Sequence, residues 1–391
     1  MKIVFFVHPE FLESQSMPRF AAMLSEGMRQ RGHEVEVLAP KPFFFRLPTP
    51  QKFKKWLGYL DQYMMFPLRV KRLLSSYTAK NTLFVFTDHA LGPWVPLVAN
   101  FPHVIHCHDF LAQRSALDEV VENRTTATGK RYQAYIRRGF RHGKHFISVS
   151  QKTREDLHRF LKATPASSDV VYNGLNQSFK PVNPTEARIL LSQQLNIDLT
   201  GGFMLHVGGN QWYKNRRGVI LIYDAWKKKA ASNIPLLMIG RKPGASLCST
   251  ANQLESKETI HWLSGVSDDQ VKLAYAGALA FIFPSLAEGF GWPIAEAMAS
   301  GCPVITTNEA PMTEVAGEAG FMIPKAPYQP EALEEWALNA AKIVDQVVHL
   351  TPPQRKAVVD KGIENASQFD TDLALDRIES IYLEILKPAN K

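Results

Sequence analysis

The sequence predicts a two-domain α/β protein built around parallel sheets. Three observations favour this fold class: the length of the chain, apolar runs of strand length that alternate with helical stretches, and a restart of that rhythm after a polar segment. The chain has 391 residues, which suits two domains at roughly 100–200 residues each. Its 45% hydrophobic and 21% charged residues exclude a disordered or fibrous protein.

The first half of the chain predicts a parallel sheet with crossing helices. Residues 3–7 form a continuous apolar run, as expected of a strand buried on both faces. Phe20, Leu24 and Met28 recur every four residues, which predicts a helix that Gly32 ends. Further strands are expected at residues 35–39, 83–86, 104–106 and 146–149. Repeated strand–helix–strand units indicate an α/β domain.

The second half repeats this pattern after a proline-containing linker at residues 176–184. Strands are expected at residues 203–207, 236–239, 280–283 and 304–307. The last segment predicts an amphipathic helix that packs back on the first domain, with apolar residues at spacings of four, three and four: Ala374, Ile378, Ile381 and Ile385. The expected boundaries are 1–178 and 179–370 for the domains and 371–391 for this helix.

Cysteine content and hydropathy bear on location. Cys107, Cys248 and Cys302 are an odd number scattered along the chain, which argues against a disulfide framework and for a reducing compartment. The apolar run near the N-terminus is too short for a secretion signal, and no run reaches the roughly 18–20 apolar residues of a spanning helix. A cytoplasmic protein is expected.

The most informative segment is FIFPSLAEGFGWPIAEAMASGCPVITT, residues 281–307. A strand leads into a loop with Glu288, then a Gly-Phe-Gly turn, then a helix that begins near Pro293 and includes Glu296. Amide groups at a helix start attract an anion such as pyrophosphate, and Gly291 lets a ligand approach the backbone. The two carboxylates suit sugar hydroxyls better than phosphate, since like charges repel. For the glutamate pair alone, solvated side chains are an equally good interpretation.

Together with other segments, this block resembles the retaining family-four glycosyltransferases, which have the GT-B fold of two facing Rossmann-like domains. The resemblance extends over nearly the whole chain, through residues 32–35, 148–153, 171–175, 206–215 and 265–268. It implies a nucleotide-sugar donor, transfer with retention of the anomeric configuration, and neither an obligatory metal nor another cofactor.

The resemblance also implies roles for particular residues. The expected catalytic residues are His108, Lys214 and Glu288. Donor sugar and phosphate contacts are expected from Gly209, Asn210, Lys214, Glu288, Phe290, Gly291, Trp292 and Ile294. Ribose and base contacts are expected from Arg241, Trp262, Leu263 and Glu296, and acceptor contacts from Ser14, Gln15, Asp88, His89 and Asp109.

Some of these residues have plain structural interpretations. A lysine is usually a solvated surface residue, although Lys214 follows a strand and a Gly-Gly turn, where its charge suits a departing diphosphate. Trp262 suits the core equally well, and His106 and Asp109 suit core hydrogen bonds. His106, His108 and Asp109 make a poor zinc site because no fourth ligand is clustered with them.

Two departures from the family pattern stand out. Many relatives have an arginine six residues before the lysine that Lys214 matches, and this chain has Gly208 there. Arg216 and Arg241 are the candidates to replace it. The polar loop at residues 13–16 takes the place of a glycine-rich loop, which leaves the acceptor geometry open.

Other functions are weaker interpretations. A dinucleotide-dependent oxidoreductase lacks its G-x-G-x-x-G fingerprint. A sugar-nucleotide epimerase of the same fold stays open, although residues 288–291 favour transfer. A non-catalytic basic membrane-surface module is the remaining alternative, and no nucleic-acid motif is present. We expect transfer of a hexose to a glycan or lipid-linked acceptor in polysaccharide biosynthesis, with UDP-glucose favoured as donor and GDP-mannose next.

The net charge of +8 is unevenly distributed. Residues 41–80 carry nine Lys and Arg against Asp61 alone, interleaved with aromatics, and residues 130–144 carry six without an acid. Basic residues mixed with aromatics suit an anionic membrane surface, and hence a peripheral protein at the inner membrane face. An ordinary basic helix with its aromatics in the core is an equally good interpretation.

Overall fold

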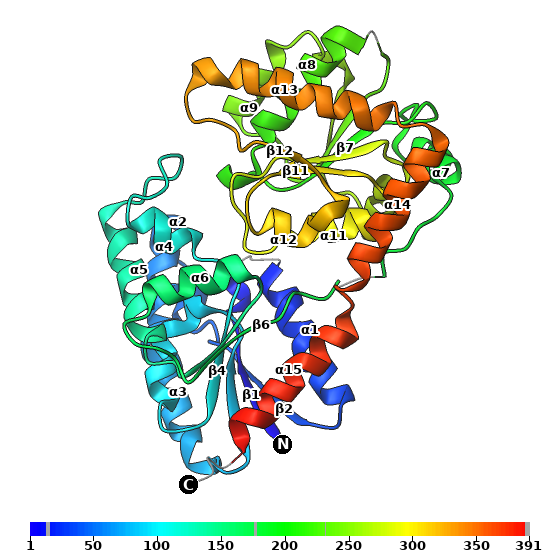
Figure 1. Cartoon of the computed structure of the whole chain (residues 1–391). Helices are drawn as coiled ribbons and strands as arrows, with labels where there is room; N and C mark the ends of the chain where they lie inside the picture. Colours follow the sequence, from blue (N-terminus) through cyan, green and yellow to red (C-terminus); the bar gives the residue numbers. More distant parts are fainter. Residues whose placement is uncertain (13–15, 176–177, 231, 388–391) are drawn as a thin grey trace. The chain divides into compact units, whose positions relative to one another are not determined.

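The structure, a computed structural model, describes residues 1–12, 16–175, 178–230 and 232–387. They form two compact units, one from residues 1–176 with 371–391 and the other from residues 177–370 (Figure 1). Each unit contains a six-stranded parallel sheet with helices on both faces. The predicted α/β fold class is therefore confirmed.

The sheet of the first unit has the strand order β2-β1-β3-β4-β5-β6, with every neighbouring pair parallel. The strand order reverses between β1 and β3: β2 lies on one side of β1, and β3 to β6 follow one another on the other side. Side chains of β3 and β4 are buried throughout. The strands are β1 (Lys2–Phe6), β2 (Glu34–Leu38), β3 (Thr82–Phe86), β4 (His103–Cys107), β5 (His145–Ser148) and β6 (Ser167–Val170).

Helices cover both faces of this sheet, with α1 and α15 on one face and α3 and α5 on the other (Figure 1). The α-helices are α1 (Ser16–Gln30), α2 (Gln51–Leu60), α3 (Phe66–Leu73), α4 (Leu111–Ala116), α5 (Ala127–Phe140), α6 (Gln151–Phe160) and α15 (Thr371–Leu386). Shorter helical turns are η1 (Glu10–Leu12), η2 (Phe44–Arg46), η3 (Asp61–Met65), η4 (Leu74–Ser76) and η5 (His89–Val98).

Residues 51–73 form one continuous helical segment in which η3 is a π-helical turn between α2 and α3. Pro67 follows this turn and has no N–H to donate, and such a residue locally disturbs the α-helical ladder. The buried side of the segment carries Gln62 and Phe66, and the backbone oxygen of Gln62 accepts the indole N–H of Trp94 at 2.9 Å. The segment is thereby fixed to the core of the first unit.

The C-terminal helix α15 is part of the first unit. It buries Ala374, Ile378 and Ile381 and packs against α1. At the surface of the same contact, Arg31 Nη2 donates to Asp376 at 2.7 Å.

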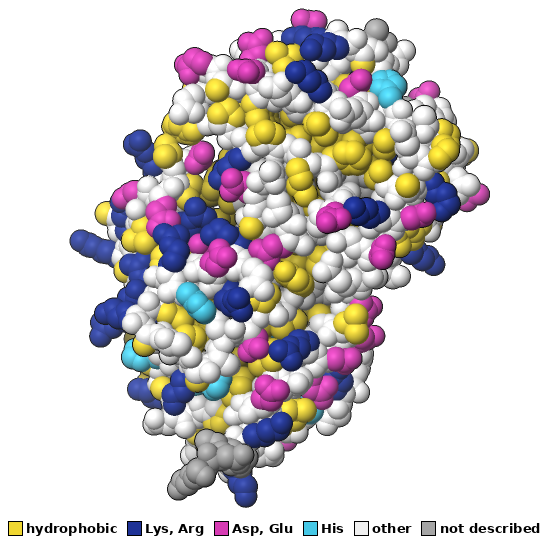
Figure 2. Space-filling model, in the orientation of Figure 1, with side chains coloured by type: hydrophobic (Ala, Val, Ile, Leu, Met, Phe, Trp, Pro, Cys, Tyr) yellow, Lys and Arg dark blue, Asp and Glu magenta, His cyan; other side chains and the backbone are white. Residues whose placement is uncertain are grey.

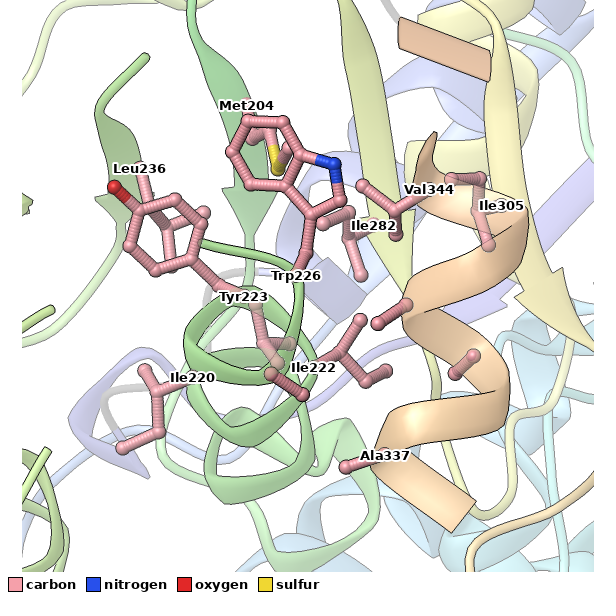
Figure 3. Close-up of a cluster of buried hydrophobic side chains, with 14 of the residues drawn as sticks. Met204, Ile220, Ile222, Tyr223, Trp226, Leu236, Ile282, Ile305, Ala337 and Val344 are labelled. Atoms are coloured by element: carbon pink, nitrogen blue, oxygen red, sulfur yellow. The ribbon is translucent and has the colours of Figure 1, made fainter. Parts of the chain in front are cut away.

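The second unit has the strand order β12-β11-β10-β7-β8-β9, again parallel throughout. Its order reverses between β7 and β10. On one face Tyr223 and Trp226 of α8 and Val344 of α13 pack on the central strands (Figure 3). The strands are β7 (Met204–Val207), β8 (Leu236–Ile239), β9 (Ile260–Leu263), β10 (Ala280–Phe283), β11 (Val304–Thr307) and β12 (Phe321–Ile323).

Helices of the second unit also divide between two faces, α8, α9 and α13 on one and α11 and α14 on the other (Figure 1). Helix α10 contacts α11 and α7. The α-helices are α7 (Pro184–Leu195), α8 (Arg216–Ala230), α9 (Ala245–Asn252), α10 (Asp268–Gly277), α11 (Trp292–Ala299), α12 (Met312–Ala316), α13 (Pro330–Val348) and α14 (Pro352–Ser367). The shorter turns are η6 (Trp212–Lys214), η7 (Lys257–Thr259) and η8 (Gly317–Ala319).

Three strands of the structure, β6, β9 and β12, were not predicted from the sequence. All three lie at sheet edges, where one side has no neighbouring strand and most of the side chains are only partly buried. Polar residues interrupt the apolar pattern in β6 and β9, and the apolar run of β12 is only three residues long, so none matches the longer apolar runs of the central strands.

Within the described ranges, the structure has no helix that is both long and apolar enough to cross a membrane.

Candidate functional site

The second unit brings a lysine and a glutamate together at the carboxyl edge of its sheet. Lys214 ends the loop after β7, and Glu288 lies in the loop after β10. These strands flank the point where the strand order reverses, which is where ligands bind in open α/β sheets. Lys214 Nζ lies 2.8 Å from Glu288 Oε1, with side chains only 14% and 7% exposed. Lys214 is therefore not a freely solvated lysine.

Backbone and amide contacts join the two loops that carry this pair. Asn215 adopts a left-handed conformation (φ 49°) and its Nδ2 donates to the oxygen of Pro284 at 3.0 Å. The N–H of Leu286 donates to the oxygen of Tyr213 at 2.7 Å. Lys214 Nζ also lies 4.9 Å from the centre of the Phe283 ring. These contacts between the two loops fix Lys214 and Glu288 relative to each other.

Ser285 supports the glutamate and was not singled out from the sequence. Its hydroxyl donates to Glu288 Oε1 at 2.8 Å, and its backbone oxygen accepts from the Thr307 hydroxyl at 2.8 Å. Ser285 is fully buried. The only signal was its place in the Pro-Ser dipeptide after the strand, which does not indicate where the hydroxyl points.

The start of α11 lies next in the chain after Glu288. Gly291 has φ 104°, a left-handed conformation that favours glycine. Pro293 lies in the first turn, as predicted. Phe290 packs on Phe369 at a ring distance of 5.3 Å. The side chain of Ile294 is fully buried, so only its backbone could meet phosphate, and its N–H donates to the oxygen of Gly291 at 2.9 Å.

The expected ribose-binding carboxylate is held by a buried tyrosine. Tyr275 donates its hydroxyl to Glu296 Oε2 at 2.9 Å. Burial, together with the charge of Glu296, raises the pKa of Tyr275 well above its usual value, so the hydroxyl stays protonated as a donor. Tyr275 comes from α10, and nothing in its sequence context links it to Glu296.

Removing this hydroxyl should weaken nucleotide binding without affecting the fold. For Tyr275→Phe we expect a loss of about 2 kcal/mol in nucleotide affinity, since the change deletes one hydrogen bond to an ionised group. Calorimetric titration with the nucleoside diphosphate measures it. Tyr223→Phe is the matched control, because it removes a buried hydroxyl of the same unit that bonds the oxygen of Ile234 and the Thr259 hydroxyl and not Glu296. Equal losses in both variants would contradict the role of Tyr275.

Of the two arginines considered for the missing position, Arg216 is buried and Arg241 is exposed. Arg216 Nη1 donates to Asn210 Oδ1 and, at 2.8 Å, to the backbone oxygen of Arg241. Its guanidinium lies 5.1 Å from the centre of the Trp262 ring. Arg216 therefore joins the loops after β7 and β8 beside a pocket of about 510 Å³.

An arginine at position 208 does not fit this arrangement. A Cβ added to Gly208 would lie 2.8 Å from His206 Nε2. His206 is fixed in turn, because its Nδ1 donates to the oxygen of Ile282 at 2.9 Å. Burial lowers the pKa of His206 to about 3, so the ring is neutral.

The other expected donor contacts are spread along the same edge. Asn210 Nδ2 donates to the oxygen of Lys242 at 2.7 Å. Trp262 and Leu263 are half-buried at the end of β9, so Trp262 is partly core and partly accessible. Gly209 lies in the loop that leads to Lys214.

The first unit has a corresponding pair at its own reversal of strand order. His8 follows β1 and Asp88 follows β3, and His8 Nε2 lies 2.9 Å from Asp88 Oδ2. Asp88 Oδ1 accepts from the N–H of Ala90 at 3.0 Å and lies 3.0 Å from His89 Nδ1. Burial favours a neutral Asp88, but His89 and His8 outweigh it and lower the pKa of Asp88 well below its usual value.

His8 is a candidate that the sequence patterns did not indicate. Its side chain is 18% exposed and that of Asp88 is 12% exposed. The available signal was its position just after the first strand, at the same sheet edge as Asp88.

His108 lies beside this cluster. Its Nε2 is 2.9 Å from the backbone oxygen of Thr87, which only accepts, so Nε2 carries the proton and Nδ1 is the ring's acceptor. Burial lowers the pKa of His108 and keeps the ring neutral, while Asp88 and Asp109 act against this. The ring packs on Phe20 at 4.4 Å.

His106 makes a core hydrogen bond, one of its sequence interpretations: it bonds the Tyr382 hydroxyl at 2.7 Å. The remaining acceptor-side residues have mixed positions. Asp109 Oδ1 accepts from the N–H of Leu111, and His89 is buried against Phe110. Ser14 and Gln15 lie outside the described residues.

Comparison with known proteins gives two family matches that together cover most of the chain. Residues 188–342 match the model "Glycosyl transferases group 1", and residues 17–179 match "Glycosyltransferase Family 4". The chain belongs to the group 1, family 4 glycosyltransferases. Its two parallel sheets agree with the two-domain GT-B fold of this family.

Among relatives of this glycosyltransferase, O-antigen chain mannosyltransferase B of Escherichia coli is 30% identical over 180 residues, 45% of this chain and 46% of that protein. The match thus spans about half the length of this relative. Phosphatidyl-myo-inositol mannosyltransferase of Mycobacterium leprae is 24% identical, over 94% of this chain and 92% of that protein. HepE of Anabaena, solved with UDP and glucose, has a TM-score of 0.69 at 18% identity, covering 98% of this chain and 100% of HepE.

Proposed function

We propose that this protein transfers a hexosyl group from a nucleotide sugar to a glycan or lipid-linked acceptor, with retention of configuration. The observation that carries the proposal is the Lys214–Glu288 pair at the carboxyl ends of the neighbouring strands β7 and β10, with Lys214 in the loop after β7 and Glu288 in the loop that precedes α11. A fixed cation beside a carboxylate suits a ligand that combines a diphosphate with sugar hydroxyls.

In the proposed reaction the bond between the anomeric carbon and the diphosphate breaks, and a glycosidic bond to the acceptor oxygen forms on the same face. Lys214 offsets the charge that develops on the departing diphosphate. Glu288 accepts hydrogen bonds from the sugar hydroxyls, and Glu296 accepts from the ribose. The acceptor hydroxyl loses its proton to the departing diphosphate. The neutral His108 accepts a hydrogen bond from a hydroxyl of the transferred sugar through Nδ1. Metal independence is part of the proposal by family resemblance.

The donor is proposed from the relatives and the sequence together. UDP-glucose and GDP-mannose are the two donors that the sequence favours. Three of the relatives, two O-antigen chain mannosyltransferases and a phosphatidyl-myo-inositol mannosyltransferase, are named for mannosyl transfer. Their names support a mannosyl donor. The HepE complexes with UDP and UDP-glucose support the other choice.

A ligand panel tests both the class and the donor. We expect UDP-glucose or GDP-mannose to raise the thermal unfolding temperature, with a smaller rise in Lys214→Ala, because only the native state binds the ligand. ADP-sugars and NAD serve as controls. Stabilisation by NAD alone would contradict the proposal, as would formation of an epimerised nucleotide sugar without transfer to any acceptor.

The acceptor and the location complete the proposal. The mannosyltransferase relatives are named for O-antigen chains and for phosphatidyl-myo-inositol. They support an acceptor from polysaccharide or glycolipid assembly. The basic residues of 41–80 and 130–144 support a peripheral position at the inner membrane face.

A further inference from the structure

The helical segment 51–73 presents an apolar stripe to solvent. The stripe consists of large apolar residues spaced by three, four, four and four: Phe53, Trp56, Leu60, Met64 and Leu68. Their exposed fractions run from 41% for Leu60 to 58% for Trp56. The buried side of the same segment is offset by two residues, at Gly58, Gln62, Phe66 and Val70. An offset of two residues is about 200° around a helix, so the stripe faces away from the core.

All the exposed charged side chains of residues 51–73 are basic. Lys52, Lys55, Lys71 and Arg72 are exposed. Asp61 is the one acid of residues 51–73, and it is fully buried. Its carboxylate accepts the backbone N–H groups of Phe44 and Phe45, each at 2.9 Å. The acid that the sequence places among these basic residues therefore contributes nothing to the outer surface.

A second basic helix lies against the same segment. Tyr59 stacks on Tyr132 of α5 at 5.3 Å, and the hydroxyls of Tyr63 and Tyr132 are 2.6 Å apart. Helix α5 contains no acid and exposes Arg131 and Arg138. Lys and Arg side chains gather along the edge of the first unit that carries α5 (Figures 1 and 2). The two basic windows of the sequence thus lie side by side.

We propose that this stripe, with the basic residues beside it, docks on an anionic lipid bilayer. From Phe53 to Leu68 the stripe is about 22 Å long at 1.5 Å per residue, which suits a helix lying in the plane of the interface. Apolar side chains enter the headgroup boundary while Lys and Arg contact the anionic headgroups. The proposal rests on the proposed function in one respect: docking on a bilayer would bring the protein to a lipid-linked acceptor.

The charge distribution argues against a second copy of the chain as the occupant. A two-fold dimer through the stripe would bring Lys52, Lys55, Lys71 and Arg72 against the same residues of its partner, with no surface acid in the segment to pair with them. An anionic bilayer supplies the missing negative charge.

Not every lysine of the segment is free for lipid. Lys54 Nζ donates to the backbone oxygens of Phe45 and Leu47 at 2.7 and 2.9 Å. Replacing Lys54 would therefore disturb the loop before α2. Lys52 and Lys55 instead lie over the neighbouring aromatic rings of Phe53 and Tyr59, respectively. The charge test therefore uses Lys52 and Lys55.

The experiment is co-sedimentation of the full chain with vesicles of phosphatidylcholine alone and with added phosphatidylglycerol. We expect binding only with phosphatidylglycerol, weakened by salt, and reduced at least tenfold in the variant Trp56→Ser/Leu60→Ser/Met64→Ser. Lys52→Glu/Lys55→Glu should also bind at least tenfold more weakly. Among the seven tryptophans, all within the described residues, only Trp56 is exposed. Lipids with brominated acyl chains should therefore quench wild-type fluorescence, and Trp56→Phe should lose the effect.

Matched controls replace equally exposed residues elsewhere in the first unit. Leu117→Ser/Val121→Ser/Leu383→Ser, at 46%, 49% and 44% exposure, should bind like the wild type, as should Lys162→Glu/Lys387→Glu. Unchanged binding in the stripe variant would overturn the proposal, and so would a stripe-dependent dimer in sedimentation velocity without vesicles. Donor binding in solution, measured on the same variants, separates a failure of this proposal from a failure of the proposed function.

Discussion

Replacing Lys214 by alanine is expected to lower the transfer rate about 10²–10³-fold, the usual cost of removing a group that stabilises charge in a transition state. The lysine is 14% exposed and already oriented by Glu288, so its charge acts on the departing diphosphate with little reorganisation. Glu288→Gln should reduce the rate by a similar factor, because glutamine lacks the negative charge that accepts the sugar hydroxyls and pairs with Lys214. Steady-state kinetics with the donor from the ligand panel measures both.

The double variant sharpens this test. Because Lys214 and Glu288 contact each other, the Lys214→Ala/Glu288→Gln enzyme should lose much less than the product of the two single effects. Lys228→Ala is the matched control, since it breaks another ion pair of the second unit, with Asp224 at 3.0 Å. Near-wild-type transfer in either single variant would show that the pair is not the catalytic site.

Changing Asp88 to asparagine is expected to reduce transfer about 10²-fold, the cost that misplacing a positioned group by about 1 Å can have. The Asp88→Asn change keeps the shape and a side-chain oxygen for the Ala90 N–H but removes the charge that orients His8. Nucleotide binding should not change, because all its expected contacts lie in the second unit. Separate measurement of kcat and of KM for the acceptor, with nucleotide affinity, distinguishes this role from a general structural one.

The pH dependence of stability gives an independent check on Asp88. Its pKa is lowered in the folded state, so its charge stabilises the fold above the pKa of the unfolded chain, and this contribution disappears as the pH falls through the folded-state value. The wild type should therefore be more stable than Asp88→Asn near neutral pH and lose that advantage in acid. Asp169→Asn, which removes a more exposed carboxylate paired with Arg377 at 3.5 Å, should show a much smaller pH-dependent difference. Equal behaviour of the two variants would contradict the assignment.

The sequence predicted those parts of the site that lie in one stretch of chain. Glu288 and Glu296 share a strand–loop–helix segment, and Lys214 follows a strand with its own motif. Ser285, Tyr275 and His8 act through contacts with residues 3, 21 and 80 positions away. Even the near contact of Ser285 depends on how its loop folds back, which no pattern of residue types records.

The fold shows the same division between local pattern and packing. Central strands were predicted because burial on both faces demands a continuous apolar run. Three of the four edge strands were missed, as the polar strand Ser167–Val170 illustrates, whereas β2 was predicted from its alternating valines. The aromatic residues of 41–80 split between the two interpretations: Phe66 and Tyr77 are buried, whereas Phe53 and Trp56 face solvent.

The crowding at Gly208 limits how this protein can change. Any side chain at position 208 must displace His206, whose ring is pinned in the core by Ile282. Gaining the arginine that many relatives carry would therefore require at least two coordinated substitutions, the first of which carries a cost before the second brings a benefit. Arg216 is equally constrained, because it joins Asn210 to the Arg241 backbone. Grafting an arginine at position 208 in the laboratory therefore calls for a smaller residue at 206 in the same step.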